Sequence, residues 1–173
     1  DIVHTKTDIS PELVQMVSEF LNNLAKIRPT VIIAGNHDAN LNNSSRLDAL
    51  TPIVDNLNND NLYYLRDSGI YTFADVDFIV YSILDSIDKW PTAKNSKSKN
   101  KIGLFHGAVN NSKTDAGYTV RDENLPLKTF NGCHMTMLGD IHKFQHLNAA
   151  ETVTYAGSLI QQNFGESFEN HGY

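Results

Sequence analysis

The stretch Val31-Ile-Ile-Ala-Gly-Asn-His-Asp38 decides the interpretation of the chain, because an apolar run leads directly into a polar turn. Its first four residues are short, mostly β-branched and apolar on both faces, which is typical of a strand buried between two layers. Gly35-Asn-His-Asp38 follows at the carboxyl end of that strand, where sites of α/β proteins usually lie. The stretch therefore predicts a functional loop directly after a buried strand.

Helical periodicity flanks this strand on both sides. Before it, Ser10 can cap a helix and Pro11 suits the first helical position, while Pro29 ends the pattern. The apolar face of this helix is formed by Leu13, Val14, Val17, Phe20, Leu21, Leu24 and Ile27. After the strand, residues 45–57 predict a second helix, whose apolar side consists of Leu47, Leu50, Ile53, Val54 and Leu57.

Further along the chain the period changes to two, which indicates strands. Two of the predicted strands lead into polar motifs, His106-Gly107 and Gly139-Asp-Ile-His142. A last hairpin is expected from 152–155 and a strand that starts at Ser158, and the polar, low-complexity residues 92–101 indicate an exposed loop. The strands are predicted at 62–65, 70–73, 77–83, 102–105, 135–138 and 152–155.

Length and composition limit the class of protein. The 173 residues fit one domain, and 40% of them are hydrophobic. No apolar run approaches the ~18 residues that a membrane span needs, no signal peptide is visible, and the single Cys133 cannot form an internal disulfide. We expect a cytoplasmic, intracellular protein without a membrane partner. The net charge of -6 argues mildly against a bare nucleic-acid groove, unless bound cations supply positive charge.

Polar clusters follow four separate strand ends. They offer nitrogen and oxygen donors for divalent ions, without the thiolates that favour structural zinc. A carboxylate can bridge two cations, and such a pair can hold a phosphodiester and lower the pKa of a bound water. The pattern therefore predicts a two-metal site, although each histidine taken alone could be an ordinary surface or core residue. The clusters are Asp1 with His4; Asn36, His37 and Asp38; His106; and Asp140 with His142.

These motifs resemble those of the calcineurin-like metallophosphoesterases, which run D-x-H, G-D-x-x-[HN], G-N-H-[DE], H and G-H-x-H along the chain. Asp1-Ile-Val-His4 resembles the second motif without its glycine, and Gly35-Asn-His-Asp38 matches the third. His106-Gly107 matches the fourth, and Gly139-Asp-Ile-His142 is similar to the fifth. The resemblance implies an α/β fold, a four-layer αββα sandwich of two mixed β-sheets flanked by helices.

The same resemblance implies a set of metal ligands. Asp1 corresponds to the carboxylate that bridges two divalent ions. Asn36, His106 and Asp140 would hold the second ion, and His142 the first. Asp140 stands where the family usually has histidine, which favours hard ions, manganese or magnesium, over zinc.

Catalytic roles follow from the resemblance as well. His37 matches the histidine that contacts the scissile phosphate and can protonate the leaving oxygen, with Asp38 as its orienting partner. His4 resembles the companion histidine that places the substrate strand. The simpler interpretations remain open: Asp38 as a turn or helix-cap residue, and His4 as a loop residue.

One family motif has no counterpart in this sequence. The aspartate and histidine of the first motif are absent, so we expect a single domain over residues 1–173, truncated at both ends and lacking its first strand. The first ion would keep only Asp1 and His142 as ligands. We therefore expect the chain by itself to bind one ion well and to be nearly inactive as an enzyme.

Within the family, the chain is most similar to SbcD-like DNA repair exonuclease subunits. Three segments carry the likeness: Ser10-Pro-Glu12, Tyr155-Ala-Gly-Ser158 and Phe164-Gly-Glu166. It implies metal-dependent cleavage of DNA, an SbcC-like ATPase partner and, as an option, a homodimer. The Tyr155 segment would contact substrate, with Gly157 and Ser158 offering backbone amides to a phosphate or simply forming a turn.

Two other functions stay open. One is a phosphatase or phosphodiesterase that acts on nucleotides, proteins or small phosphates. The other is a non-catalytic module that docks to an ATPase, but such a surface would have no need for Asn36, His37 and His106 together.

Overall fold

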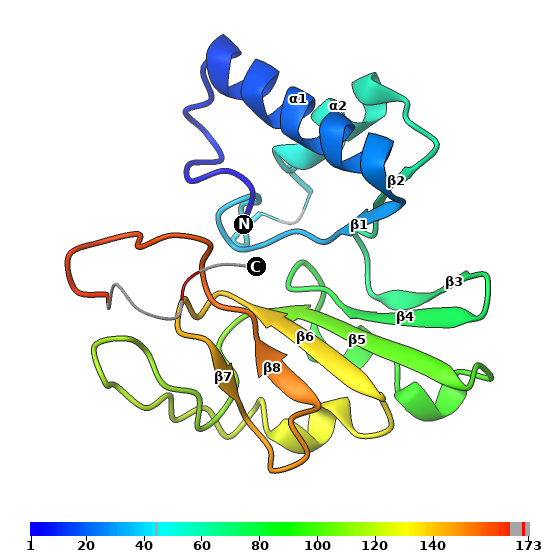
Figure 1. Cartoon of the computed structure of the whole chain (residues 1–173), viewed down its shortest axis with the longest axis vertical. Helices are drawn as coiled ribbons and strands as arrows, with labels where there is room; N and C mark the ends of the chain where they lie inside the picture. Colours follow the sequence, from blue (N-terminus) through cyan, green and yellow to red (C-terminus); the bar gives the residue numbers. More distant parts are fainter. Residues whose placement is uncertain (44, 167–170, 172–173) are drawn as a thin grey trace.

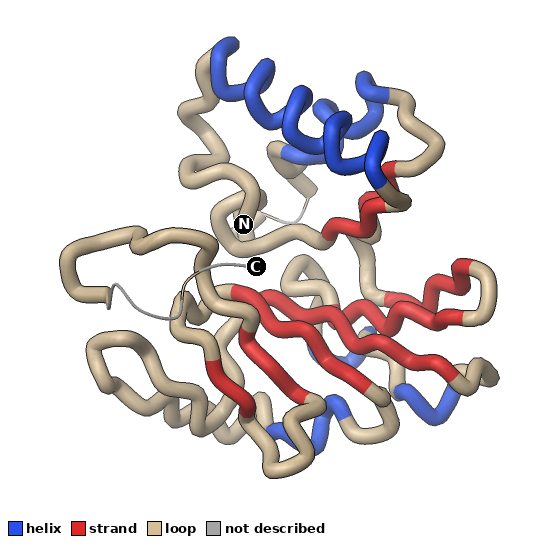
Figure 2. Tube along the Cα trace, in the orientation of Figure 1, coloured by secondary structure: helices blue, strands red, loops and turns tan. Residues whose placement is uncertain are grey.

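The computed structural model describes residues 1–43, 45–166 and 171. Two α-helices cover a small two-stranded sheet, and a six-stranded sheet lies beyond it (Figure 1). Short 3-10 helices and loops cover the far side of the larger sheet (Figure 2). The predicted α/β class, with two sheets and helices outside, is confirmed; the outer layer on one side is made of 3-10 helices.

Helix α1 (Pro11–Ile27) begins as its sequence predicts. The Ser10 hydroxyl accepts a hydrogen bond from the Leu13 backbone N–H at 3.2 Å, and Pro11 takes the first helical position. One face of α1 is buried through Val17, Leu21 and Ala25. This cap and this apolar face fix both the start and the orientation of the helix.

The helical layer packs on strands β1 (Thr30–Ile32) and β2 (Leu62–Tyr64), which pair in parallel. Helix α2 (Leu50–Leu57) lies beside α1 in this layer. The helix predicted over 45–57 starts at Leu50, five residues later than expected. Asp48 caps it by accepting hydrogen bonds from the N–H groups of Leu50 and Thr51. A core of Val3, Val17, Leu21, Ala25, Ala49, Ile53 and Leu62 joins the two helices to the sheet.

The larger sheet has the strand order β3-β4-β5-β6-β8-β7. Its strands are β3 (Gly69–Phe73), β4 (Val76–Tyr81), β5 (Asn100–His106), β6 (Met135–Gly139), β7 (Gln145–His146) and β8 (Val153–Tyr155). Strands β4, β5, β6 and β8 run parallel, whereas the two outer strands, β3 and β7, are antiparallel to their neighbours. The sheet is therefore mixed, and the carboxyl ends of β4, β5, β6 and β8 lie along the same side of it.

The second core lies between this sheet and the 3-10 layer. Tyr81 and Tyr155 are fully buried in it, together with Phe105, Phe130 and Leu138. The 3-10 helices η1 (Ile87–Lys89), η2 (Ala93–Asn95) and η3 (Leu127–Phe130) belong to this layer. Residues 92–101, predicted as an exposed loop, in fact contain η2 and the start of β5.

The prediction for the last hairpin was wrong in one strand. β8 pairs with Gln145–His146, which precede it, and residues 158–166 contain no strand in the structure. No helix formed by the described residues is both long and apolar enough to cross a membrane.

Candidate functional site

Parallel pairing brings two of the predicted motifs together. Strands β5 and β6 pair with His106 opposite Gly139, so His106 and Asp140 leave the same edge of the larger sheet. The loop after β1 brings Asn36 to this edge from the small sheet, and Asp1 lies there too. The site is therefore assembled from both sheets, at the ends of their strands.

The ring of His106 is the centre of this cluster. Its Nε2 atom lies 3.0 Å from Asn36 Oδ1, 3.2 Å from Asp1 Oδ2 and 3.9 Å from Asp140 Oδ1. Burial lowers the pKa of His106 to about 4, so the imidazole is neutral at neutral pH. A neutral imidazole surrounded by oxygen donors is the form of histidine that binds metal ions.

The four donors fit a divalent cation. Ligand atoms that share one ion at roughly 2.0–2.2 Å lie about 3 Å or a little more from one another, which is close to the separations around His106 Nε2. In residues 1–43, 45–166 and 171, no group of three or more His, Cys, Asp or Glu side chains could hold a metal ion in its present arrangement. His106 Nε2 donates to the amide oxygen of Asn36. Binding an ion through Nε2 therefore requires its proton to move to Nδ1 and the ring and its neighbours to separate slightly around the ion.

Two glycines make this close approach possible. A β-carbon on Gly35 would lie 2.1 Å from Asp1 Oδ1, and one on Gly139 would lie 2.7 Å from His106 Nδ1. Any larger residue at either position would push a donor out of the cluster. The glycines of the third and fifth motifs are thus required by sterics.

Asp1 and Asp38 tie the first residues to the loop after β1. Asp1 accepts the His37 backbone N–H with Oδ1 and faces His106 with Oδ2, so its two oxygens serve different partners. The buried Asp38 carboxylate accepts the backbone N–H groups of Ile2, Val3 and Gly35, at 2.8 to 2.9 Å. Asp38 therefore holds two chain segments together.

The predicted role of Asp38 as orienting partner of His37 needs correction. His37 Nδ1 donates to the His4 carbonyl at 2.7 Å, and the two imidazole rings stack with centroids 5.1 Å apart. Asp38 instead accepts three backbone N–H groups, and the Nδ1 atom of His37 is already bonded to the His4 carbonyl. His4 thus orients His37.

His142 contacts a residue for which the sequence suggested no role. His142 Nδ1 lies 2.7 Å from an oxygen of Glu166, whose side chain is buried. Burial by itself raises the pKa of Glu166, but hydrogen bonds from the Gln162 N–H and from His142 outweigh it and lower the pKa. Phe164-Gly-Glu166 was the only sequence signal for this residue.

Asp140, two residues before His142, has a positive φ of 92°, a strained conformation of the kind found at functional sites.

The three predicted substrate residues lie in different surroundings. Tyr155 is fully buried: its hydroxyl donates to the Gly107 carbonyl at 2.6 Å and accepts the Val109 N–H at 2.9 Å. Its side chain therefore shapes the loop after His106 and does not reach the cleft. Gly157 and Ser158 do line the cleft, but the Ser158 N–H is bound to the His142 carbonyl.

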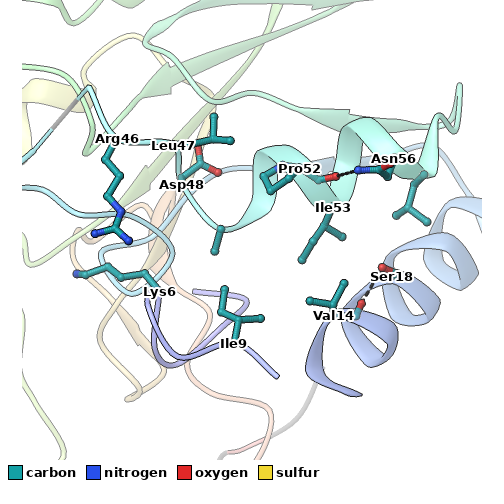
Figure 3. A pocket seen from close by; sticks show the side chains of 12 residues that line it. Lys6, Ile9, Val14, Ser18, Arg46, Leu47, Asp48, Pro52, Ile53 and Asn56 are labelled. Atoms are coloured by element: carbon teal, nitrogen blue, oxygen red, sulfur yellow. Dashed lines mark hydrogen bonds between the residues drawn. The ribbon is translucent and has the colours of Figure 1, made fainter. Parts of the chain in front are cut away.

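Two cavities differ in chemistry. The cleft beside the donors has a volume of about 350 Å³ and is lined by Asp1, His106, Asp140, His142, Gly157, Ser158 and neighbouring residues. A larger cavity of about 570 Å³ lies between α1, α2 and the loop around Lys6 (Figure 3). Its walls are largely apolar, and none of the predicted metal ligands lines it. The smaller cleft is therefore the candidate active site.

Comparison with known proteins agrees with this geometry. The model of the calcineurin-like phosphoesterase family matches residues 1–152. The chain is also 46% identical, over 182 residues, to the uncharacterized protein R555 of Acanthamoeba polyphaga mimivirus. The match covers 99% of this chain but only 13% of that protein. Since the family match covers most of the chain, including every strand except β8 and every predicted metal ligand, the chain belongs to the calcineurin-like phosphoesterases, a family of metal-dependent phosphoester hydrolases.

Proposed function

We propose that this domain hydrolyses phosphodiester bonds in DNA with two divalent ions, preferably manganese, as a nuclease of the SbcD-like repair type. The observation that carries the proposal is the convergence of Asp1, Asn36 and Asp140 oxygens on His106 Nε2, next to the loop that bears His37. Divalent ions held there would polarise a phosphodiester and supply a nucleophilic water at neutral pH. They would also offset the net charge of -6 that otherwise repels DNA.

The residues of the chain contribute orientation and proton transfer. The bond from His37 Nδ1 to the His4 carbonyl fixes the ring. In the imidazolium form, which carries a proton on each ring nitrogen, Nε2 can donate its proton to the leaving oxygen and the ring becomes neutral. The contact between the Asp1 carboxylate and the His37 N–H sets the distance between this ring and the donors. Both contacts position His37 before the substrate binds, so less conformational entropy is lost when the substrate and the ring are brought together.

The preference for DNA is supported by the SbcD-like segments at the end of the chain. One of them, Phe164-Gly-Glu166, contacts the predicted ligand His142 through Glu166, so this likeness extends to the site. An SbcC-like ATPase as partner belongs to the same proposal and rests on the same likeness.

The test compares three substrates for the protein expressed from its complete reading frame: linear duplex DNA, bis(p-nitrophenyl) phosphate and p-nitrophenyl phosphate, each with Mn²⁺ or Mg²⁺. We expect DNA and the diester to be cut and the monoester to be nearly inert. Faster cleavage of the monoester would indicate a phosphatase instead. Bound metal without cleavage of any of the three would indicate a docking module.

A further inference from the structure

We propose that Glu166 is a positioning residue that holds the ring of His142 in the orientation and tautomer needed to bind a divalent cation through Nε2. This inference rests on the proposed metal site. It concerns the chain's own geometry, which can be measured without any substrate.

The carboxylate of Glu166 is itself firmly held. Oε1 lies 2.7 Å from His142 Nδ1 and accepts the Asn163 side-chain amide at 2.6 Å, while Oε2 accepts the Gln162 backbone N–H at 2.8 Å. The turn around it is closed by bonds from the Glu166 N–H to the Asn163 carbonyl and from the Gln161 side chain to the Glu166 carbonyl. Glu166 therefore presents a fixed acceptor to the ring.

Burial distinguishes the two partners. The side chain of Glu166 is 3% exposed, whereas that of His142 is 46% exposed and lines the cleft. Glu166 lines a small neighbouring cavity and not the cleft, and its two oxygens already accept three hydrogen bonds, so it is poorly placed to hold an ion in the cleft. Its effect on an ion must pass through His142.

The chemistry of the contact determines the tautomer. An ionised carboxylate only accepts hydrogen bonds, so Nδ1 of His142 must carry the proton. In the neutral ring, Nε2 then has the lone pair. Metal-bound histidines commonly donate their other ring N–H to a carboxylate, which fixes the ring and makes the ligand nitrogen more basic.

The same segment also holds the backbone of His142. The Ser158 N–H donates to the His142 carbonyl at 2.9 Å. Gly157 allows this approach, because it has a φ of 77° and a β-carbon there would lie 2.9 Å from the same carbonyl. Residues 157–166 thus fix both the main chain and the ring of His142, after β6 has ended at Gly139.

The first experiment examines the metal-free protein. Long-range ¹H–¹⁵N NMR spectra identify which ring nitrogen of His142 carries the proton. We expect Nδ1–H in the wild type and loss of this preference in Glu166→Gln, because an amide can present either a donor or an acceptor to the ring. A wild-type ring protonated mainly at Nε2 would overturn the proposal without reference to any variant.

The second experiment measures Mn²⁺ binding by calorimetry. Loss of such a partner typically costs about 10- to 100-fold in metal affinity, and we expect this loss for Glu166→Gln with an unchanged circular dichroism spectrum. Glu151→Gln is the matched control, because Glu151 is an exposed carboxylate only 4.0 Å from His146, and it should change nothing. Unchanged Mn²⁺ affinity in Glu166→Gln would overturn the proposal.

A double-mutant cycle separates positioning from general stabilisation. In a His142→Ala background, Glu166→Gln should have no further effect on Mn²⁺ affinity, since the residue acts through the ring. If the losses of Mn²⁺ affinity were additive, Glu166 would not act through the His142 ring. If these results hold but DNA remains uncut by the wild type, the proposed nuclease function fails and the positioning role stands.

Discussion

Two segments near the candidate site, residues 35–38 and 157–166, each contain a buried carboxylate, but the two carboxylates bind different kinds of partner. Asp38 accepts only backbone N–H groups, and so joins residues 2 and 3 to the loop after β1. Glu166 accepts a backbone N–H, an amide and the imidazole of His142. Asp38 fixes the path of the main chain, whereas Glu166 fixes the orientation of the His142 ring.

This difference separates stability from function. Removing a backbone anchor leaves buried N–H groups without acceptors, which costs folding free energy. Glu166 accepts one backbone N–H where Asp38 accepts three, and its other partners are the side chains of Asn163 and His142, so its replacement should affect metal binding more than folding. Four variants test this contrast, and they are described from the largest expected effect to the smallest.

His37→Ala should have the largest effect, on turnover alone. A positioned proton donor contributes roughly 10²- to 10⁴-fold to rate, and its loss should appear in kcat while Mn²⁺ affinity stays within about twofold, because His37 acts on the phosphate. Steady-state kinetics on DNA and calorimetry with Mn²⁺ measure the two quantities. Turnover close to wild type at saturating Mn²⁺ would show that the assigned role is wrong.

Asp38→Asn should reduce stability most. One amide NH₂ group must then face a backbone N–H that had a carboxylate acceptor, which costs about 1–3 kcal/mol. Urea unfolding measures the loss. Glu166→Gln should lose clearly less stability in the same assay, and equal losses would remove the distinction between the two carboxylates.

Asp140→His should change metal preference. The substitution replaces an anionic oxygen donor by a neutral nitrogen, which favours zinc or cobalt over manganese. We expect a shift of about tenfold in relative affinity, equivalent to ~1.4 kcal/mol. Competition titrations with the three ions provide the measurement, and identical affinities in both proteins would mean that Asp140 is not a ligand.

Asp48→Asn should act on stability alone, by about 1 kcal/mol, because asparagine can still cap α2 but weakens the charged hydrogen bond from Arg66. Asp48 lines the larger cavity, away from the predicted ligands. Although burial raises the pKa of Asp48, hydrogen bonds from Arg66 and Thr51 outweigh it and lower the pKa. A lowered folded pKa means that the stabilisation is present above the unfolded pKa and is lost as the pH falls through the folded value.

The wild type and Asp48→Asn should therefore differ in unfolding free energy at pH 7 and converge below a pH of about 4. Urea unfolding across this range gives the curve. A constant difference at every pH would show that the ionised form of Asp48 does not carry the effect, and altered Mn²⁺ affinity would place Asp48 in the site.

Local patterns were sufficient for most elements of the fold. Ser10 and Pro11 marked the start of α1, and the apolar run before Gly35 became β1 and the segment after it. Caps, turns and β-branched runs act over a few residues, so they can be recognised without knowledge of the rest. The late start of α2 follows from the local Asp48 cap, which the apolar period alone did not reveal. The pairing of β8 with Gln145–His146 could not be recognised from local patterns, because it depends on bonds between separate strands.

The sequence by itself determined the types of ligand atom at the candidate site, which are nitrogen and oxygen. It also placed them after strands, and the carboxyl ends of neighbouring parallel strands lie close together. Only the tertiary structure decided which groups touch. His106 meets Asn36 across 70 residues, Tyr155 is buried beneath the loop after His106, and Glu166 reaches His142 across 24 residues. Such contacts follow from how whole layers pack, since a side chain's partners depend on every segment that competes for the same space.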